Sequence, residues 1–187
     1  MRFVPFSRFA LLLAGWLSTA SPAAARPGAA QGDDADVAVV QTSATVKIHA
    51  PRETVWAMLT SCQKALEMVA GLTDCQVLDT APDGSWQLIR QVMAYSWVVP
   101  KLTYVLRASY DYPSSIIMER ESGDLRKLRS SWYLDADGEF TVVRYSLEVT
   151  PGFWVPRWLA RIALKHDLPK MLRILRTHAE SAFDAPK

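Results

Sequence analysis

The change from strand to helix between Ala44 and Trp56 constrains the fold of this chain more than any other feature. Apolar and polar residues alternate over Thr45–His49, which predicts a short strand. Pro51 suits the first turn of a helix, where its missing N–H is not needed, and Glu53 favours the positive helix start. A helix is therefore expected to begin at Pro51, directly after the strand.

Six further strand-like segments follow, and turn residues separate them. They are Cys75–Thr80, Ser85–Met93, Lys101–Asp111, Ser115–Glu121, Leu125–Leu134 and Glu139–Thr150. The first two flank Pro82-Asp83-Gly84, which is a strong hairpin signal. Several segments alternate apolar and polar residues with a period of two, so one face of the sheet is expected to be wet. Tight turns between consecutive strands indicate an antiparallel meander.

The C-terminal region reads as two helical pieces, 156–165 and 167–182. Asp167 is a good helix cap, and Pro169 belongs in a first helical turn. On the second piece, apolar residues recur at three- and four-residue spacing. They are Leu168, Met171, Leu172, Leu175, Ala179 and Ala182. These elements predict an α+β fold, in which a curved seven-stranded antiparallel sheet wraps around a C-terminal helix and two short helices follow the first strand. A cavity between sheet and helix could hold a ligand.

The N-terminal residues are expected to be a signal peptide, 1–25. Arg2 and Arg8 flank a positively charged start, a short apolar core follows, and Ala23-Ala24-Ala25 supplies the small residues of a cleavage site. The apolar core is about half the ~20 residues of a membrane-spanning helix. Residues 26–43 have no apolar periodicity and are expected to be a flexible lead-in to a domain at 44–183. We therefore expect a periplasmic or secreted protein after cleavage near Ala25.

The two cysteines, Cys62 and Cys75, lie in a chain for which export is expected. A disulfide between them would clamp the first helical region to a sheet edge, and the chain-entropy model gives it about 3 kcal/mol. The alternatives are two buried free thiols and a metal or redox pair, and the spacing does not support the latter.

The charge balance limits the kinds of partner. Removing Arg2 and Arg8 from the 21 basic residues leaves 19, against 19 acidic ones, so nucleic-acid binding is not expected. From Pro151 onward basic residues predominate, and such a helix beside aromatics can contact an anionic membrane surface. The simpler interpretation is a solvated helix face. We expect a monomer.

The order of these features resembles the START-like (SRPBCC) superfamily, especially its polyketide cyclase/dehydrase and lipid-transport branch, and is similar to coenzyme Q-binding proteins. The resemblance is carried by Ala50-Pro51 and Val55-Trp56, Gly84 in the first hairpin, the strand Leu125–Trp132, and Pro151 with Pro156. It implies the helix-grip fold and an activity of enclosing a hydrophobic small molecule. The export signal and the cysteine pair depart from the family pattern.

Strand parity predicts where such a cavity opens. In an antiparallel meander the turns after the third, fifth and seventh strands share one rim, and two of these turns are rich in aromatic and apolar residues. Trp97, Phe153, Trp154 and Trp158 are the candidate mouth, which would gate the cavity or dock on a membrane. The alternative is that these residues pack on the closing helix.

The candidate ligand-binding residues are large, adaptable apolar side chains and two phenols. They are Tyr104, Leu106, Met118, Trp132, Tyr145, Met171 and Leu175. No catalytic residue, metal site or cofactor is predicted, because the sequence contains no matching motif. Arg90 and Arg120 would orient a ligand only if they face inward.

Three functional hypotheses follow from this pattern. The first is a non-enzymatic exported carrier of a lipid, isoprenoid or polyketide-like molecule. The second is a cyclase/dehydrase-type enzyme in which Tyr104, Tyr145 or a buried arginine polarises a carbonyl. The third is an envelope protein whose aromatic rim binds another protein.

Overall fold

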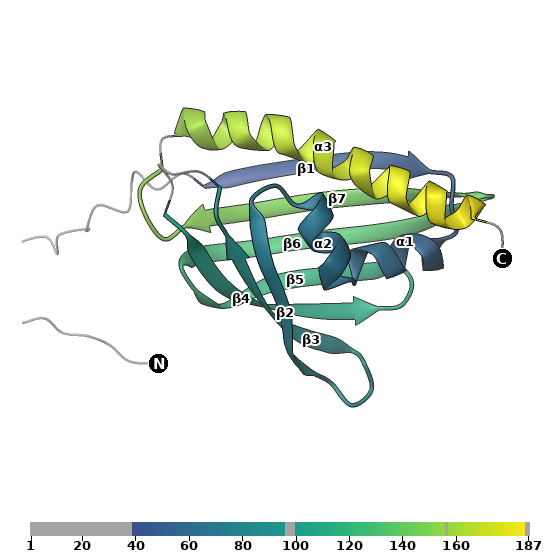
Figure 1. The fold of residues 1–187 in the computed structure, drawn as a ribbon, viewed down its shortest axis with the longest axis horizontal. Helices are drawn as coiled ribbons and strands as arrows, with labels where there is room; N and C mark the ends of the chain where they lie inside the picture. Colours follow the sequence, from purple (N-terminus) through teal and green to yellow (C-terminus); the bar gives the residue numbers. More distant parts are fainter. Residues whose placement is uncertain (1–38, 96–99, 156, 186–187) are drawn as a thin grey trace, which may run out of the picture. The chain divides into compact units, whose positions relative to one another are not determined.

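The computed structural model describes residues 39–95, 100–155 and 157–185, and for residues 157–164 it describes the backbone alone. All of these residues belong to one compact unit. The elements in chain order are β1 (Val40–Ile48), α1 (Arg52–Leu59), α2 (Cys62–Met68), β2 (Leu72–Thr80), β3 (Trp86–Met93), β4 (Leu102–Asp111), β5 (Ser115–Gly123), β6 (Leu125–Asp137), β7 (Phe140–Pro151) and α3 (Arg157–Asp184). Figure 1 shows their arrangement.

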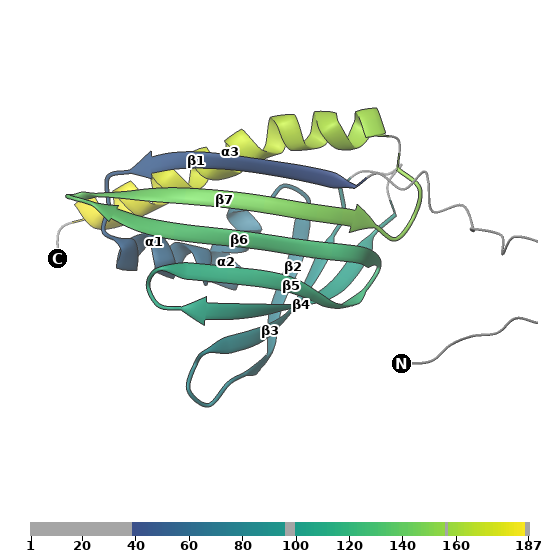
Figure 2. The same ribbon diagram turned by 180° about the vertical axis from the view of Figure 1, so that it is seen from behind.

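The strands form one antiparallel sheet in the order β1-β7-β6-β5-β4-β3-β2. Strands β2 to β7 are a meander in which each strand pairs with the next. Strand β1 lies beside β7, so the first and last strands are neighbours and β2 forms the opposite edge (Figure 2). The predicted seven-stranded sheet and the two short helices after the first strand are confirmed.

The three helices cover one face of the sheet. They lie in front of it in Figure 1 and behind it in the reverse view of Figure 2. Leu172, Leu175 and Ala179 of α3 pack in one core cluster with residues of β1, β6 and β7, including Ile48 and Val143. This cluster fixes the C-terminal half of α3 against the sheet.

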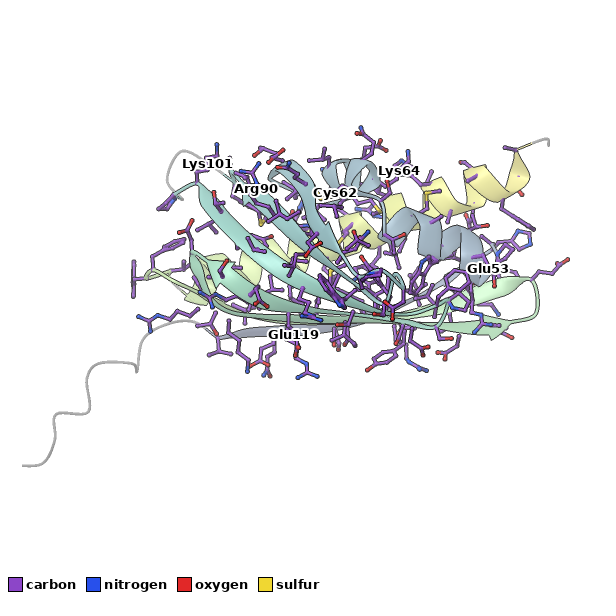
Figure 3. The ribbon with its side chains drawn as sticks, turned by 90° about the horizontal axis from the view of Figure 1, so that it is seen from below. Glu53, Cys62, Lys64, Arg90, Lys101 and Glu119 are labelled. Carbon is purple, nitrogen blue, oxygen red and sulfur yellow. A yellow bond between two sulfur atoms is a disulfide. The ribbon has the colours of Figure 1, made fainter. Side chains whose placement is uncertain are left out.

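The opposite face of the sheet is polar and charged, as the alternation predicts. Figure 3 shows Glu119 on the side away from the helices, and this carboxylate pairs with Arg129 at 3.2 Å. A second ion pair, between Lys127 and Glu148 at 2.7 Å, links β6 to β7 on the same face. The helix-bearing face is therefore the one that can enclose an apolar cavity.

Strand β1 begins earlier than the sequence pattern predicts. The expected lead-in, 26–43, overlaps the strand, since Val40–Ser43 pair with residues 146–149 of β7. Gln41 and Ser43 face outward in this segment. The outward-facing polar residues obscure the apolar periodicity of this segment in the sequence. Its backbone nevertheless pairs with β7, which makes the segment part of the strand.

The C-terminal region is one helix, so the prediction of two pieces is wrong. Helix α3 runs from Arg157 to Asp184 and contains Pro169 in its interior. An interior proline removes one helical hydrogen bond and crowds the preceding turn. Leu168 and Leu172, on either side of it, are buried in the core. Burial of these side chains outweighs the local preference for a helix start.

Candidate functional site

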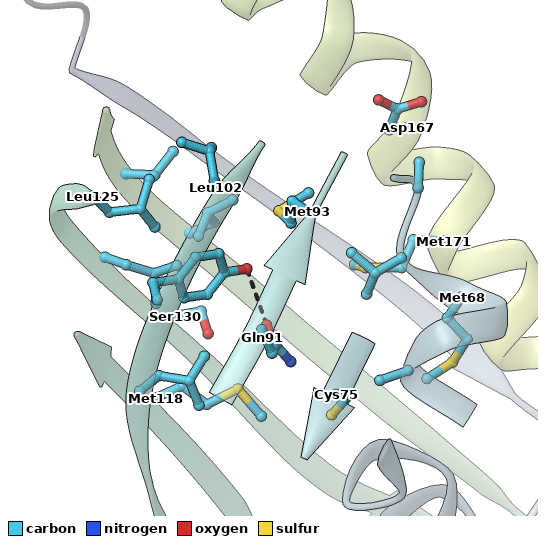
Figure 4. Close-up of a pocket in the computed structure, with 18 of the residues that line it drawn as sticks. Met68, Cys75, Gln91, Met93, Leu102, Met118, Leu125, Ser130, Asp167 and Met171 are labelled. Carbon is cyan, nitrogen blue, oxygen red and sulfur yellow. Dashed lines mark hydrogen bonds between the residues drawn. The ribbon is translucent and has the colours of Figure 1, made fainter. Parts of the chain in front are cut away.

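A cavity of about 600 Å³ lies between the inner face of the sheet and the helices (Figure 4). Its walls come from all seven strands and from the three helices, and most of the side chains that face it are apolar. Its volume is in the range of small-molecule sites, 300–1,000 Å³. The C-terminal half of α3 packs in one core cluster with β1, β6 and β7, whereas the buried residues of β3 and β4 belong to a second cluster that contains no residue of α3.

Six of the seven predicted ligand-binding residues line this cavity. They are Tyr104, Leu106, Met118, Trp132, Tyr145 and Met171. The first five lie on inward positions of β4 to β7, since Tyr104 and Leu106 alternate along β4 and Trp132 pairs with Tyr145 between β6 and β7. Met171 reaches the cavity from α3. Whether they bind a ligand stays a prediction.

Leu175 does not border the cavity, contrary to expectation. It lies one helical turn beyond Met171, has no exposed surface, and packs inside the core cluster. The same apolar face of α3 therefore passes from cavity wall at Met171 to solid core at Leu175.

Several polar side chains of the lining were not predicted, and Gln91 and Ser130 are two of them. Gln91 faces inward because it pairs with Tyr104 in the β3–β4 register. Ser130 faces inward on β6, one alternate position before Trp132, and only 5% of its surface is exposed. The period-two alternation of these strands could have placed both, but polar residues are normally assigned to the wet face.

The phenol of Tyr104 makes the one hydrogen bond between side chains drawn in the cavity close-up. Its O–H donates to Gln91 Oε1 at 3.0 Å (Figure 4). Burial raises the pKa of Tyr104 and that of Tyr145 above their ordinary values, and the Tyr104 phenol raises the pKa of Tyr145 further. Both are therefore neutral hydrogen-bonding groups at physiological pH. The Tyr145 ring packs on Trp132 with ring centroids 4.1 Å apart.

The predicted disulfide is present and forms part of the cavity wall. Cys62, at the start of α2, is bonded to Cys75 of β2, with Cα atoms 5.4 Å apart. Both residues face the cavity. The bond therefore fastens α2 to the edge strand at the side of the cavity (Figure 3 labels Cys62 on α2).

The described turns at one end of the sheet form the predicted rim. The backbone N–H of Asp124 donates to the carbonyl of Thr103 at 2.9 Å, which joins the β5–β6 turn to the start of β4. A side chain at Gly123, which has a φ of 101°, would collide with the backbone of Thr103 and Tyr104. Pro151 pairs with Leu125, so the end of β7 lies at the same rim.

The candidate mouth residues divide into three groups. Phe153 is half-buried and faces the cavity, whereas Trp154 is 64% exposed. Trp97 lies outside the described residues, and so does the side chain of Trp158.

The sequence matches the family model for polyketide cyclase / dehydrase and lipid transport over residues 48–176. The chain belongs to this family. The predicted resemblance to START-like proteins is thereby confirmed, and the matched residues include every element that lines the cavity except the start of β1. A comparison with curated protein sequences finds no match.

Solved structures of similar fold agree with the family assignment. The Zhui aromatase/cyclase of a Streptomyces species has a TM-score of 0.65 at 17% identity, covering 79% of this chain and 98% of that one. A STAR-related lipid transfer protein of Xanthomonas axonopodis has a TM-score of 0.64 at 18% identity, with 74% and 85% covered. A START superfamily protein of Mycobacterium smegmatis has a TM-score of 0.63 at 16% identity, with 76% and 98% covered. At these identities the likeness shows the fold.

In this family member the two candidate arginines do not face the cavity. Arg90 donates to Asp74 at 2.8 Å and to Gln76 at 3.0 Å, at the exposed edge of the sheet. Arg120 donates to the carbonyl of Gly123 at 3.0 Å. The ionisable carboxylate of the described cavity lining is Asp167 on α3, and burial raises its pKa.

Two further findings concern the described part of the chain. There, no group of three His, Cys, Asp or Glu side chains is arranged to hold a metal ion. No helix within it combines the length and hydropathy needed to cross a membrane.

Proposed function

We propose that this family member is an exported carrier that binds a hydrophobic small molecule in the cavity between its sheet and α3. The cavity itself carries this proposal, because about 600 Å³ of mostly apolar space is enclosed in a domain of this size. Apolar surface left facing water is unfavourable at roughly 25 cal/mol per Å², so a hydrophobic occupant stabilises the domain.

Export is supported by two observations. The first is the signal-like N-terminus, with its short apolar core and small residues before the expected cleavage point. The second is the Cys62–Cys75 disulfide, since such bonds form and persist in oxidising compartments such as the periplasm.

The family description also favours a second candidate, a cyclase/dehydrase-type enzyme. Tyr104 and Tyr145 are the groups that could polarise a substrate carbonyl. Since burial keeps both phenols protonated, they would act as hydrogen-bond donors and not as bases.

Native mass spectrometry of protein purified from its own host, followed by organic extraction, tests the proposal. A co-purified lipid, released only on denaturation, supports the carrier. Transfer of that lipid between vesicles by purified protein then tests carriage directly. If the purified protein leaves the extracted molecule unchanged, the result supports the carrier. Conversion of that molecule to a new compound supports the enzyme. A protein with no bound lipid and no uptake of apolar probes contradicts both.

A further inference from the structure

The cavity lining contains hydrogen-bond donors that have no partner among the described residues. Tyr145, Ser130 and Trp132 line the cavity, and among the described residues no hydrogen bond is made by the hydroxyl of Tyr145, the hydroxyl of Ser130 or the indole N–H of Trp132. These side chains are more than nine-tenths buried, at 8%, 5% and 7% exposed. These three polar atoms are not among the fully enclosed, unpartnered atoms of the described residues, so they stay accessible to an occupant, and one that supplies acceptors is favoured.

Gln91 adds a fourth donor. Its Oε1 accepts the proton of Tyr104 at 3.0 Å, which fixes the carboxamide with its NH₂ group unpaired among the described residues. The Tyr104–Gln91 contact therefore orients a donor from β3. In the sheet order, β4 and β5 separate this strand from the donors of β6 and β7, so the donors come from separate parts of the cavity wall.

All four donors are uncharged, and this determines the kind of acceptor. A ketone, ester or amide oxygen can accept from a phenol, hydroxyl, indole or carboxamide without bringing a net charge into the cavity. A buried carboxylate or phosphate costs far more unless a cation pairs with it. The carboxylate of Asp167, which also lines the cavity, would repel such an anion further.

We infer that the cavity selects a neutral lipid with carbonyl-type oxygens over a fatty acid or other anionic lipid, with Tyr145, Ser130, Trp132 and Gln91 as the groups that recognise these oxygens. This inference rests on the proposed ligand-binding function and specifies its substrate class. The apolar lining supplies affinity for the chain of the lipid, and the neutral donors distinguish one oxygenated lipid from another.

Three probes of one chain length test this inference: heptadecane, heptadecanoate and the methyl ketone with the same number of carbons. Each is titrated against N-phenyl-1-naphthylamine bound to the full chain, and displacement gives its affinity. The ketone should bind roughly five- to tenfold more tightly than the alkane for each donor it engages. Heptadecanoate should bind more weakly than the ketone at neutral pH, and should improve as its carboxyl becomes protonated at lower pH.

Conservative variants identify the groups responsible. Tyr145→Phe keeps the ring and removes the donor, so it should lower the ketone affinity roughly fivefold and leave alkane binding unchanged. Gln91→Leu should have a similar effect from the other side of the cavity. Tyr133→Phe is the matched control, because Tyr133 lies on the exposed outer face, and it should change neither.

Two results would overturn the inference while leaving the carrier intact. One is binding of heptadecanoate as tightly as the ketone at neutral pH. The other is an equal loss of alkane and ketone binding in Tyr145→Phe, which would mean that the residue only shapes the cavity. If neither the dye nor any of the three probes binds, the proposed function fails and the inference fails with it.

Discussion

Met171 and Leu175 lie one turn apart on the same face of α3, yet their surroundings differ. Met171 borders the cavity, and Leu175 has no exposed surface. Leu175→Ala should lower the free energy of unfolding by about 2–5 kcal/mol, because it leaves a void in solid core. Met171→Ala should lower the free energy of unfolding by less, and it should change the affinity for an apolar probe. Urea unfolding and dye titration of both variants measure this, and equal losses of stability would contradict the assignment.

Tyr110 is expected to make the folding stability of the domain depend on pH in the alkaline range. Burial raises its pKa to about 12, and its O–H donates to Gln87 at 2.9 Å. The phenol of an unfolded chain ionises near pH ~10. The stability contributed by the neutral phenol is therefore complete below pH ~10 and is lost as the pH rises from about 10 towards about 12.

Replacing this tyrosine tests the linkage. Tyr110→Phe should reduce the fall in unfolding free energy above pH ~10, as measured by urea unfolding at a series of pH values. Tyr112→Phe is the control, since Tyr112 is exposed and should leave the slope as it is. If the unfolding free energy of Tyr110→Phe fell more steeply with pH than that of the unmodified protein, the predicted contribution of the neutral phenol would be refuted.

At the residue scale, side-chain direction was predictable and the shape of the cavity was not. Alternation placed Tyr104, Leu106 and Tyr145 on the inner face. It could not show that Gln91 points inward, because a polar residue in a strand equally fits the solvated face. Nor could it distinguish Leu175 from Met171, since the distance between helix and sheet is a tertiary property.

At the element scale, Pro169 shows tertiary packing overriding a local signal. Pro169→Ala should raise the free energy of unfolding by about 1–3 kcal/mol, because it restores the backbone N–H that would bond to the carbonyl of Lys165. Part of the gain is offset by the greater freedom of the unfolded chain. Thermal unfolding measures the change. Lys170→Ala, exposed on the next position, should shift the melting temperature little, and a destabilised Pro169→Ala would refute the explanation.

The strands themselves were predictable because their turns have distinctive chemistry. Gly84 and Gly138 have φ values of 71° and 62°, which glycine tolerates best, and both sit in hairpins that the sequence indicates. The start of β1 and the continuity of α3 were not predictable. The start of β1 depends on pairing with residues of β7 about a hundred positions away, and the continuity of α3 depends on packing against the sheet. A local sequence pattern contains no information on either contact.

At the scale of the whole molecule, the rim is the expected point of contact with a membrane. Phe153 and Trp154 follow β7 at the end of the sheet where the cavity lining includes Tyr95, Pro100 and Val155. Aromatic side chains are favoured at the headgroup level of a bilayer. Phe153→Ser with Trp154→Ser should therefore reduce liposome co-sedimentation and slow ligand transfer.

The control for this prediction lies at the other end of the sheet. Tyr112, in the β4–β5 turn, is as exposed as Trp154, at 64%. Tyr112→Ser should leave liposome binding unchanged. A large fall in the melting temperature of the Phe153→Ser and Trp154→Ser variant would assign these aromatics to the core and remove them from the membrane contact.

For the proposed carrier, we expect the bond between Cys62 and Cys75 to restrict the route by which a ligand exchanges. It cross-links α2 to β2, so the helix and the edge strand should not separate there, and the end of the sheet near Phe153 is the expected passage. In a Cys62→Ser and Cys75→Ser variant the seam can open, and dye should leave faster even where its equilibrium affinity is little changed. Protein prepared under reducing conditions would therefore release its cargo on a different timescale from protein prepared in an oxidising compartment.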